Sequence, residues 1–321
     1  MPESKIFTLT MNPAIDKSAS VRQVEPNRKL RCQEPSFFPG GGGINVARAV
    51  CKLGGEVKAI YPAGGPTGDR LEQLLEKEGI SQRRIKTESW MRESLAITEE
   101  ATNNQYRFDM PGPHLQEKEW ESCLDIILKE SQTADFLVAS GTLPPGVPVD
   151  FYAQFAEKTR NSHLKLIVDT SGESLKKIKR SGLFLLKPNL RELCDLMGRE
   201  LASEEDQEKA AKELVNDGTC EVLVLSLGAG GVLLVTRDLQ ERFRSPTVPV
   251  KSRIGAGDST VAGIVLGMTR KMDLIEAVLF GISSGAAAVM TPGTELCRRD
   301  DTERIFNSMK EENKEKLGLI R

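Results

Sequence analysis

The chain has 321 residues, of which 39% are apolar and 28% charged, and its formal net charge is -2 at pH 7. Its size and composition are those of a soluble globular protein with a sizeable core, and the near-neutral charge gives no support for a nucleic-acid or membrane-surface binder. No apolar run reaches the roughly 18 residues that a membrane span needs, and Met1–Lys5 lacks an apolar signal core. We therefore expect a cytoplasmic protein without nucleic-acid or membrane partners.

Cysteine and histidine are poorly placed for metal or triad chemistry. The six cysteines are scattered without a C-x-x-C pair, which argues against a zinc cage and against a disulfide framework. Only two histidines occur, His114 and His163, and both lie among polar residues. We expect reduced thiols and surface histidines.

The chain begins with a strand-like run, Ile6–Thr10, which Asn12-Pro13 ends. Asp16 lies just beyond, at the carboxyl end of this strand, where open α/β sheets bind their ligands. Residues 16–38 and 89–110 then differ in character from the rest, because polar and apolar residues alternate there in four short segments. These segments predict a small antiparallel sheet that acts as a lid or a dimerisation sheet. They are Lys17–Val21, Leu30–Phe38, Ser94–Thr98 and Gln105–Met110.

Four consecutive glycines, Gly40–Gly43, open an amphipathic helix that contains Asn45. Their spacing does not fit a dinucleotide-binding fingerprint, and no lysine follows as in a P-loop. Such a run costs conformational entropy, so it indicates that something approaches the backbone closely. Two interpretations remain open: a loop against a polyhydroxylated ligand, with the Asn45 amide on its hydroxyls, or a hinge between the small sheet and the body.

The body, residues 1–15, 39–88 and 111–321, alternates strand-like and helix-like runs. Strands are predicted at Glu56–Tyr61, Phe136–Ala139, Leu164–Asp169, Phe184–Lys187 and Val222–Leu227. Helices are predicted at Asp69–Glu78, Lys118–Glu130, Val149–Thr159, Leu190–Met197, Glu204–Asn216, Leu274–Met290 and Asp301–Lys314. This alternation predicts a three-layer α/β/α architecture with a mostly parallel central sheet.

The stretch Gly255-Ala256-Gly257-Asp258, followed by an apolar run, carries the strongest chemical signal. Free amides at such a helix start form a site for a phosphate or a developing oxyanion. An adjacent carboxylate can accept the proton of a hydroxyl that attacks a phosphoryl group. The alternative is an ordinary helix start whose acid favours the helix dipole.

Three further sets of residues have both a functional and a structural interpretation. Asn189 and Glu192 are spaced to organise a hydrated Mg²⁺, or to form a capping box. The glycine turn that follows Ser226 allows close contact with a nucleotide, or a simple hairpin. The basic residues of the small sheet could bind a phosphorylated substrate, or they could form a solvated face of the sheet. These residues are Lys29, Arg31, Arg92 and Arg107.

In this order the pieces resemble the ribokinase-like (PfkB) family of sugar kinases along nearly the whole chain. The matching stretches are Thr8–Thr10 with Asn12-Pro13 and Asp16, Gly40–Asn45, Ser140–Gly146, Lys187–Asn189 with Glu192, Ser226–Gly228 and Gly255–Asp258. Within the family, the chain is most similar to the branch of minor bacterial-type 6-phosphofructokinases. This closer similarity is carried by Lys29–Cys32, the four-glycine run Gly40–Gly43, Pro62–Gly65 and Gln105–Phe108.

The resemblance implies ATP-dependent phosphorylation of the carbon-1 hydroxyl of fructose 6-phosphate, with Mg²⁺. Asp258 would be the general base, and Gly255, Ala256 and Gly257 would supply the amides of an anion hole. It implies that Asp16, Gly41, Gly42 and Asn45 bind sugar hydroxyls, while the basic residues of the small sheet bind the 6-phosphate, in part from a partner subunit. The implied substrate-binding set is Asp16, Lys29, Arg31, Gly41, Gly42, Asn45, Arg92, Arg107 and Ser140.

The resemblance also implies a nucleotide site, metal sites and a homodimer joined through the lid. Lys187, Asn189, Ser226 and Gly228 would line the ATP site, and Glu192 with Asn189 would order Mg²⁺ indirectly. Enzymes of this kind often hold K⁺ near the anion hole, although Ser252-Arg253 stands here where the family usually has Asp-Thr. The candidate K⁺ ligands are the backbone oxygens of Ser252, Ile254, Ala288 and Gly293.

Two alternative substrates and one alternative class of protein remain open. Tagatose-6-phosphate kinase and 1-phosphofructokinase differ from the favoured activity only in the sugar phosphate. A nucleotide-binding regulator without catalysis would keep the fold, but the intact base and glycines speak against it. The lid cations speak against a kinase for an uncharged nucleoside or vitamin.

Overall fold

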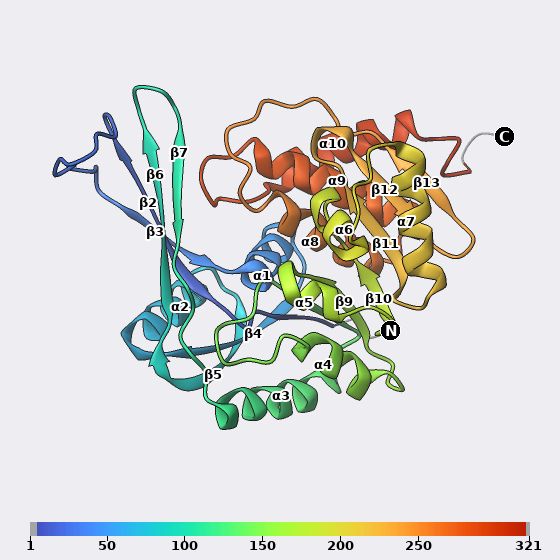
Figure 1. The fold of residues 1–321 in the computed structure, drawn as a ribbon. Helices are drawn as coiled ribbons and strands as arrows, with labels where there is room; N and C mark the ends of the chain where they lie inside the picture. The colour runs from blue at the N-terminus through green and yellow to red at the C-terminus, as the bar shows by residue number, and fades with distance from the viewer. Residues whose placement is uncertain (1–4, 319–321) are drawn as a thin grey trace.

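A large twisted sheet crosses the molecule, and a smaller sheet projects from one end of it (Figure 1). The computed structural model describes residues 5–318. The strand order of the large sheet is β13-β12-β11-β10-β9-β8-β1-β4-β5. All neighbouring pairs from β11 through β10, β9, β8, β1 and β4 to β5 are parallel. Strands β12 and β13 extend the β11 edge as antiparallel strands. The predicted mostly parallel sheet is therefore confirmed.

The strands of the large sheet are β1 (Ile6–Leu9), β4 (Val57–Gly64), β5 (Ser81–Trp90), β8 (Phe136–Ser140), β9 (Lys165–Asp169), β10 (Leu183–Leu186), β11 (Cys220–Ser226), β12 (Val232–Val235) and β13 (Gln240–Phe243). Two of them, β5 and β13, were not predicted, because charged residues interrupt their apolar patterns.

Helices cover both faces of the sheet (Figure 1). One face is covered by α1 (Gly42–Lys52), α2 (Gly65–Lys77), α8 (Ala256–Thr269), α9 (Leu274–Val289) and α10 (Arg299–Glu312). The other is covered by α3 (Glu117–Ser131), α4 (Phe151–Thr159), α5 (Gly172–Lys177), α6 (Leu190–Met197) and α7 (Glu204–Asn216).

Alternation along the strands explains why two apolar cores form. In β8, Phe136 and Val138 pack in the core beneath α1 and α8, whereas Leu137 and Ala139 pack in the core beneath α3 and α4. Successive side chains of a strand point to opposite faces, so a strand buried on both faces must be apolar throughout. The near-continuous apolar runs of the sequence are thereby explained.

The small sheet contains β2 (Ala14–Val21), β3 (Ser36–Gly40), β6 (Arg92–Glu99) and β7 (Gln105–Asp109), in the order β3-β2-β6-β7. Both outer pairs are antiparallel, whereas the central pair, β2 and β6, is parallel. A pattern of alternating residues cannot reveal this parallel pairing. The prediction of one strand over Leu30–Phe38 is wrong for residues 30–35, which are an exposed loop before β3.

The chain order places ligand-binding positions at the centre of the large sheet. From β1 the chain continues outward to β4 and β5, and later returns to β8 on the other side of β1. The carboxyl ends of β1 and β8 therefore flank a topological switch point, where open α/β sheets form their binding crevice. Ser140 ends β8 there, and residues 10–16 follow β1.

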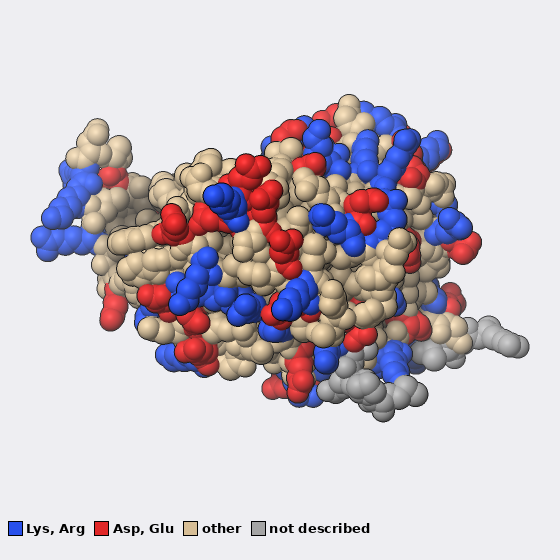
Figure 2. Space-filling view, turned by 90° about the horizontal axis from the view of Figure 1, so that it is seen from below, with Lys and Arg blue, Asp and Glu red and all other residues tan. Residues whose placement is uncertain are grey.

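Charge is mixed over the surface, as the net charge indicated. In Figure 2 basic and acidic side chains alternate over most of the visible face, and basic ones gather at the projecting end of the small sheet. Among the helices of residues 5–318, none combines the length and apolarity that crossing a membrane would require.

Candidate active site

The glycine run passes close to two of the predicted binding residues. A Cβ atom on Gly40 would lie 2.5 Å from the Asp16 carboxylate, and one on Gly42 would lie 2.2 Å from Ser140 Oγ. At such separations a side chain at either glycine would displace Asp16 or Ser140. The run therefore brings Asp16, Ser140 and the start of α1 together at the switch point. Gly41, between them, has a φ of 108°.

Asp258 faces this group from the first turn of α8. Gly255 precedes the helix with a φ of 72°, and Ala256, Gly257 and Asp258 are its first three residues. Their amides precede the first intrahelical bond, so they can bind an anion. Asn45 Nδ2 donates to Asp258 Oδ2 over 3.0 Å, which joins α8 to α1.

The carboxyl of Asp258 lies in surroundings that favour its protonated form. Burial is the larger cause and the nearby Asp169 carboxylate the next, and together they raise the pKa of Asp258 to about 7, against the opposing effects of Asn45 and Lys187. A carboxylate with such a pKa is suited to proton transfer at neutral pH.

Lys187 extends the site toward the next strands. It follows β10, is buried, and its Nζ lies 3.2 Å from Asp169 Oδ2 at the end of β9. A Cβ atom on Gly257 would lie 3.5 Å from the same ammonium, so Lys187 borders the anion-binding turn. Burial acts to lower the pKa of Lys187, but Asp169, Glu192 and Asp258 outweigh it and keep the amine charged.

The register of the small sheet places Asp16, Arg92 and Arg107 on one face. Asp16 is paired with Ser94, Arg92 lies two residues before Ser94, and Arg107 lies two residues before Asp109, the partner of Ser94. Residues two apart share a face of a strand. Burial raises the pKa of Asp16, while Arg107 and Arg92 oppose that effect.

Arg92 is anchored where the small sheet meets the body. Its guanidinium donates to the carbonyl oxygens of Asn12 and Met110, each over 3.2 Å. Its Nε is buried without a hydrogen-bond partner among the described residues. Lys29 and Arg31, by contrast, lie in the exposed loop before β3, so their predicted placement on a strand is wrong.

Asn189 and Glu192 form the capping box that the sequence left as an alternative. Asn189 Oδ1 accepts from the Glu192 amide over 2.9 Å, and Glu192 Oε2 accepts from the Asn189 amide over 2.8 Å. Burial and the Asp169 carboxylate nevertheless raise the pKa of Glu192. Within residues 5–318 no three His, Cys, Asp or Glu side chains group as direct metal ligands.

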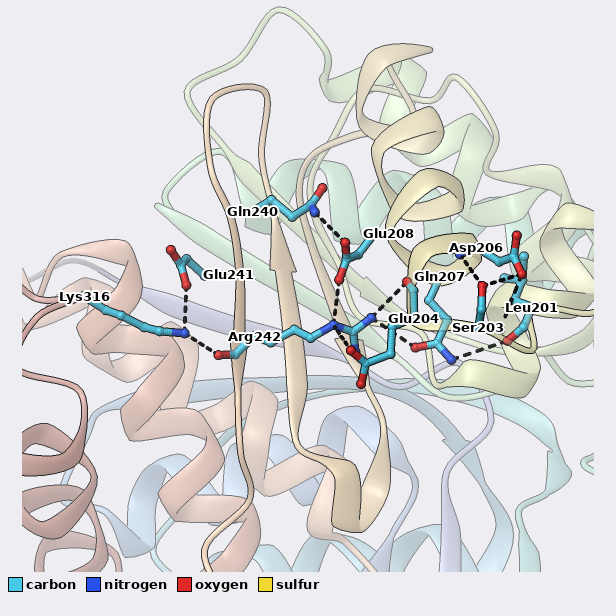
Figure 3. Close-up of polar contacts among 10 residues, drawn as sticks. All are labelled: Leu201, Ser203, Glu204, Asp206, Gln207, Glu208, Gln240, Glu241, Arg242 and Lys316. Carbon is cyan, nitrogen blue, oxygen red and sulfur yellow. Dashed lines mark hydrogen bonds and ion pairs between the residues drawn. The ribbon is translucent and has the colours of Figure 1, made fainter.

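Ser226 and Gly228 border a pocket of about 480 Å³ next to the Asn189 turn. The hairpin interpretation is confirmed, because β11 and β12 pair antiparallel around this turn. Figure 3 shows how Arg242 of β13 fixes the far wall: its Nε lies 2.7 Å from Glu208 Oε1 and its Nη2 donates to the Glu204 carbonyl over 3.1 Å. The pocket thus has a polar rim joined to α7.

The residues nominated for K⁺ lie in two adjoining segments, 251–254 and 288–296. Ser252 Oγ donates to the Gly293 carbonyl over 2.9 Å, and Thr291 Oγ1 donates to the Ala288 carbonyl over 2.8 Å. Ile254 donates its amide to Ser252 Oγ. Ser252 is therefore in contact with Gly293, and its amide donates to the carbonyl of Val289, next to Ala288. Two of the four nominated carbonyls already accept hydroxyl hydrogen bonds.

Three residues at the site received no role from the sequence. Asp169 ends a buried strand at the carboxyl edge of the sheet. Because ligands bind at this edge, its position at the end of a predicted strand could have identified it from the sequence. Thr10 Oγ1 and Asn12 Oδ1, like Asn45 Oδ1, are buried without a partner among the described residues. Unsatisfied polar atoms of this kind are rare in native interiors.

A family model described as pfkB family carbohydrate kinase matches residues 3–301. The ATP-dependent 6-phosphofructokinase isozyme 2 of Mycobacterium tuberculosis is 49% identical, covering 94% of this chain and 89% of that protein. The isozyme 2 of Escherichia coli K12 is 42% identical, covering 94% and 98%. A 1-phosphofructokinase of Borreliella burgdorferi is 32% identical, covering 96% and 98%, and a tagatose-6-phosphate kinase of Staphylococcus epidermidis 30%, covering 95% and 98%.

Solved structures of phosphofructokinase-2 from Escherichia coli have the same fold. The complex with substrates and products gives a TM-score of 0.90 at 41% identity, covering 95% of this chain and 99% of that one. The complex with potassium gives 0.91 and the tetrameric inhibited form 0.90, each at 40% identity and covering 96% and 99%.

Proposed function

The chain belongs to the pfkB family of carbohydrate kinases, and we propose that it transfers the γ-phosphoryl group of ATP to the carbon-1 hydroxyl of fructose 6-phosphate. The observation that carries this proposal is the position of Asp258 in the first turn of α8, where the backbone amides are free. Asn45 of α1 donates a hydrogen bond to its carboxylate, so Asp258 faces the start of α1, near Asp16 and Ser140. The relatives with 42% and 49% identity are 6-phosphofructokinases, which supports this sugar phosphate over those of the more distant kinases.

In this proposal Asp258 accepts the proton of the attacking hydroxyl, because its ionised form is available near neutral pH. The amides of Gly255, Ala256 and Gly257 then stabilise the negative charge of the transferring phosphoryl group. Asn45 fixes the carboxylate through its hydrogen bond, so that one oxygen stays free for the hydroxyl.

The sugar phosphate would lie between the glycine run and the small sheet. Asp16, Gly41, Gly42, Asn45 and Ser140 are proposed to bind its hydroxyls. Arg92 and Arg107 face the same space from the small sheet and are proposed to bind the 6-phosphate, which guanidinium groups hold in two-point geometry. Lys29 and Arg31 lie on the projecting loop, from which we propose that they reach the phosphate of a neighbouring subunit.

The nucleotide would extend from the anion-binding turn past Lys187 to the pocket near Ser226. Lys187 is charged and faces this turn, as a phosphate-binding lysine must, and Asn189 and Gly228 border the pocket beyond it. Asp169 and Glu192 are close enough for the charge of Asp169 to raise the pKa of Glu192, a condition that a bound cation would relieve. Mg²⁺ bound with the nucleotide would neutralise phosphate charge.

K⁺ is proposed beneath the anion-binding turn, at the carbonyls of Ser252, Ile254, Ala288 and Gly293. Support comes from the adjoining segments and from the Escherichia coli structure in complex with potassium. A bound ion would share the Ala288 and Gly293 carbonyls with the hydroxyls that now donate to them.

Replacing Asp258 tests the proposed base directly. Asp258→Asn keeps the side-chain shape and the contact with Asn45 but removes the proton acceptor. We expect turnover to fall by ~10²-fold or more with little change in the Michaelis constants, measured by a coupled assay with ATP and fructose 6-phosphate. Near-normal turnover in this variant would refute the role.

The choice of sugar phosphate needs its own measurement. We expect fructose 6-phosphate to give the highest kcat/KM in a panel with tagatose 6-phosphate and fructose 1-phosphate. A preference for either of the latter would assign the chain to the corresponding kinase instead, while leaving the role of Asp258 intact.

A further inference from the structure

Arg48 is an almost wholly buried arginine that the proposed reaction does not use. Its side chain is 2% exposed, and it lies on α1 three residues after Asn45. A charge in such a place is costly unless it is paired and hydrogen-bonded. Glu78, at the end of α2, pairs with it in two-point geometry: Nε to Oε2 and Nη2 to Oε1, both 2.8 Å.

The third nitrogen of this guanidinium joins two segments that are distant in the chain. Arg48 Nη1 donates to the carbonyls of Pro39 and Thr294, each over 3.2 Å. Pro39 directly precedes the glycine run, and Thr294 directly follows Gly293 in the loop beneath the anion-binding turn. One side chain therefore fixes both the sugar-binding side and the phosphoryl-binding side of the site.

Arg48 also contacts the base of the small sheet. Its guanidinium lies 5.9 Å from the ring centroid of Phe38, and Phe38 is paired with Asp16 across β2 and β3. Its charge reaches the Asp16 carboxyl, where it opposes the rise in pKa that burial causes. No hydrogen bond between Arg48 and Asp16 is needed for this effect.

We propose that Arg48 is a positioning residue for phosphoryl transfer: with Glu78 as its counter-ion, it holds the glycine run and the 291–296 loop at a fixed separation so that the sugar hydroxyl meets the phosphoryl group. This inference rests on the proposed function. It assigns Arg48 no contact with either substrate, since four of its five N–H groups are directed at Glu78 and two backbone carbonyls.

Arg84 provides a matched control within the same molecule. It is a largely covered arginine, with its side chain 9% exposed, and its Nη1 lies 2.6 Å from Asp69 and 2.9 Å from Glu72. Its Nε donates to the Ala63 carbonyl over 2.9 Å. It therefore loses a comparable network on substitution, but it contacts neither Pro39 nor Thr294.

The experiment compares Arg48→Lys with Arg84→Lys in the full chain. Lysine keeps the charge but cannot reach Glu78 and both carbonyls at once. A displacement of about 1 Å can lower turnover by ~10²-fold, so we expect such a loss and a raised KM for the sugar phosphate in Arg48→Lys only. The dissociation constant of ATP alone should stay unchanged, because none of the proposed nucleotide-binding residues contacts Arg48.

A second readout does not depend on activity. Hydrogen exchange of residues 39–45 and 291–296 should accelerate together in Arg48→Lys and not in Arg84→Lys. Unchanged exchange in these segments would overturn the proposal, whether or not the wild-type protein is active. A wild-type protein that is inactive on every sugar phosphate would overturn the proposed function separately. The proposal would also be overturned if Arg48→Lys and Arg84→Lys had the same turnover and KM. A loss of ATP affinity in Arg48→Lys as large as its loss of turnover would likewise overturn the proposal.

Should Arg48→Lys not fold, Glu78→Gln serves in its place. This variant keeps the size of the side chain and removes the charge that orients the guanidinium. We expect a smaller loss of turnover, on the order of 10-fold, with unchanged ATP affinity. Wild-type turnover and exchange in Glu78→Gln would count against the proposal.

Discussion

Asp258 combines two features that oppose each other at the scale of one residue. Its position in the first helical turn favours the ionised form through the helix dipole, yet burial and Asp169 raise its pKa to about 7. A base held near neutrality binds a proton readily and is still ionised in a large fraction of molecules. The surroundings rather than the residue type therefore set its strength.

A pH profile should report this carboxyl. Because only the ionised form accepts a proton, we expect kcat/KM to fall as pH drops below about 7, the pKa of Asp258. Asp169→Asn removes one cause of the raised pKa, so the acid limb of its profile should lie at lower pH. The substrate phosphate titrates near pH 6 in both cases, and the shift between the variants separates the two effects. Coincident acid limbs would contradict this assignment.

One substitution can separate the observed capping role of Glu192 from its proposed role at Mg²⁺. Glutamine supports a capping box as glutamate does, but it carries no charge. Glu192→Gln should therefore leave the free energy of unfolding within ~0.5 kcal/mol of wild type, while the Mg²⁺ concentration for half-maximal activity rises by ~10-fold or more. Urea denaturation and a Mg²⁺ titration measure the two quantities.

The capping box of α7 gives the control for this variant. Asp206→Asn weakens the equivalent pair with Ser203, away from the proposed metal. Its Mg²⁺ requirement should equal that of wild type. If Glu192→Gln also kept the wild-type requirement, Glu192 would be a helix cap and nothing more.

At the scale of elements, α8 and α9 pack through glycines. A Cβ atom on Gly281 of α9 would lie 2.4 Å from Ile264 Cγ1 and 2.7 Å from the Thr260 carbonyl of α8. This close approach buries α8 along most of its length, and α8 carries Asp258 at its start. The geometry of the base thus depends on contacts made within the next two turns of α8.

Gly281→Ala should destabilise the protein although alanine favours helices. The gain in helix propensity is ~1 kcal/mol, whereas overpacking costs ~1–3 kcal/mol, so we expect a net loss of about 1 kcal/mol in urea denaturation. The double variant with Ile264→Ala should lose less than the sum of the single variants, because the clashing atom is removed. If Gly281→Ala were more stable than wild type, α8 and α9 would be able to move apart without cost, which would contradict this prediction.

The sequence predicted most elements but not how distant ones meet. Local patterns were sufficient for α6 and α7, whose predicted and observed bounds coincide, because caps and apolar periodicity are local. They were insufficient for residues 30–35, where alternation occurs without a neighbouring strand to pair with. The Gly255–Asp258 turn was found from its motif, whereas the pairs Asn45–Asp258, Asp169–Lys187 and Arg48–Thr294 arise only from the folded topology.

At the scale of the whole molecule, the small sheet has two faces with different chemistry. Asp16 and Arg107 occupy the face toward the site, and the opposite face presents Phe37, Tyr106 and Phe108, which are 36%, 36% and 50% exposed. Exposed aromatic groups on one surface are typical of an interface between proteins. We propose that two copies pair through this face; the tetrameric form of the Escherichia coli relative shows assembly in that protein.

Phe108→Glu should dissociate this pair, because it places a charge among the exposed aromatic side chains of this face. We expect monomers in light scattering coupled to size-exclusion chromatography, and a raised KM for the sugar phosphate if Lys29 and Arg31 act on a neighbouring subunit. Val149→Glu, a charge at another exposed apolar residue away from the small sheet, is the control. A wild-type protein that is already monomeric would exclude the pairing.

The hydrogen bond between Asn45 and Asp258 spans 213 positions of the chain. While the protein is being translated, the glycine run and the small sheet emerge long before α8 exists. With Asp258 as the proposed base, we therefore expect a nascent chain to consume no ATP, however well its first half has folded. Activity should begin only once α8 has left the ribosome and docked against α1, so a product truncated before α8 should be inert rather than partly active.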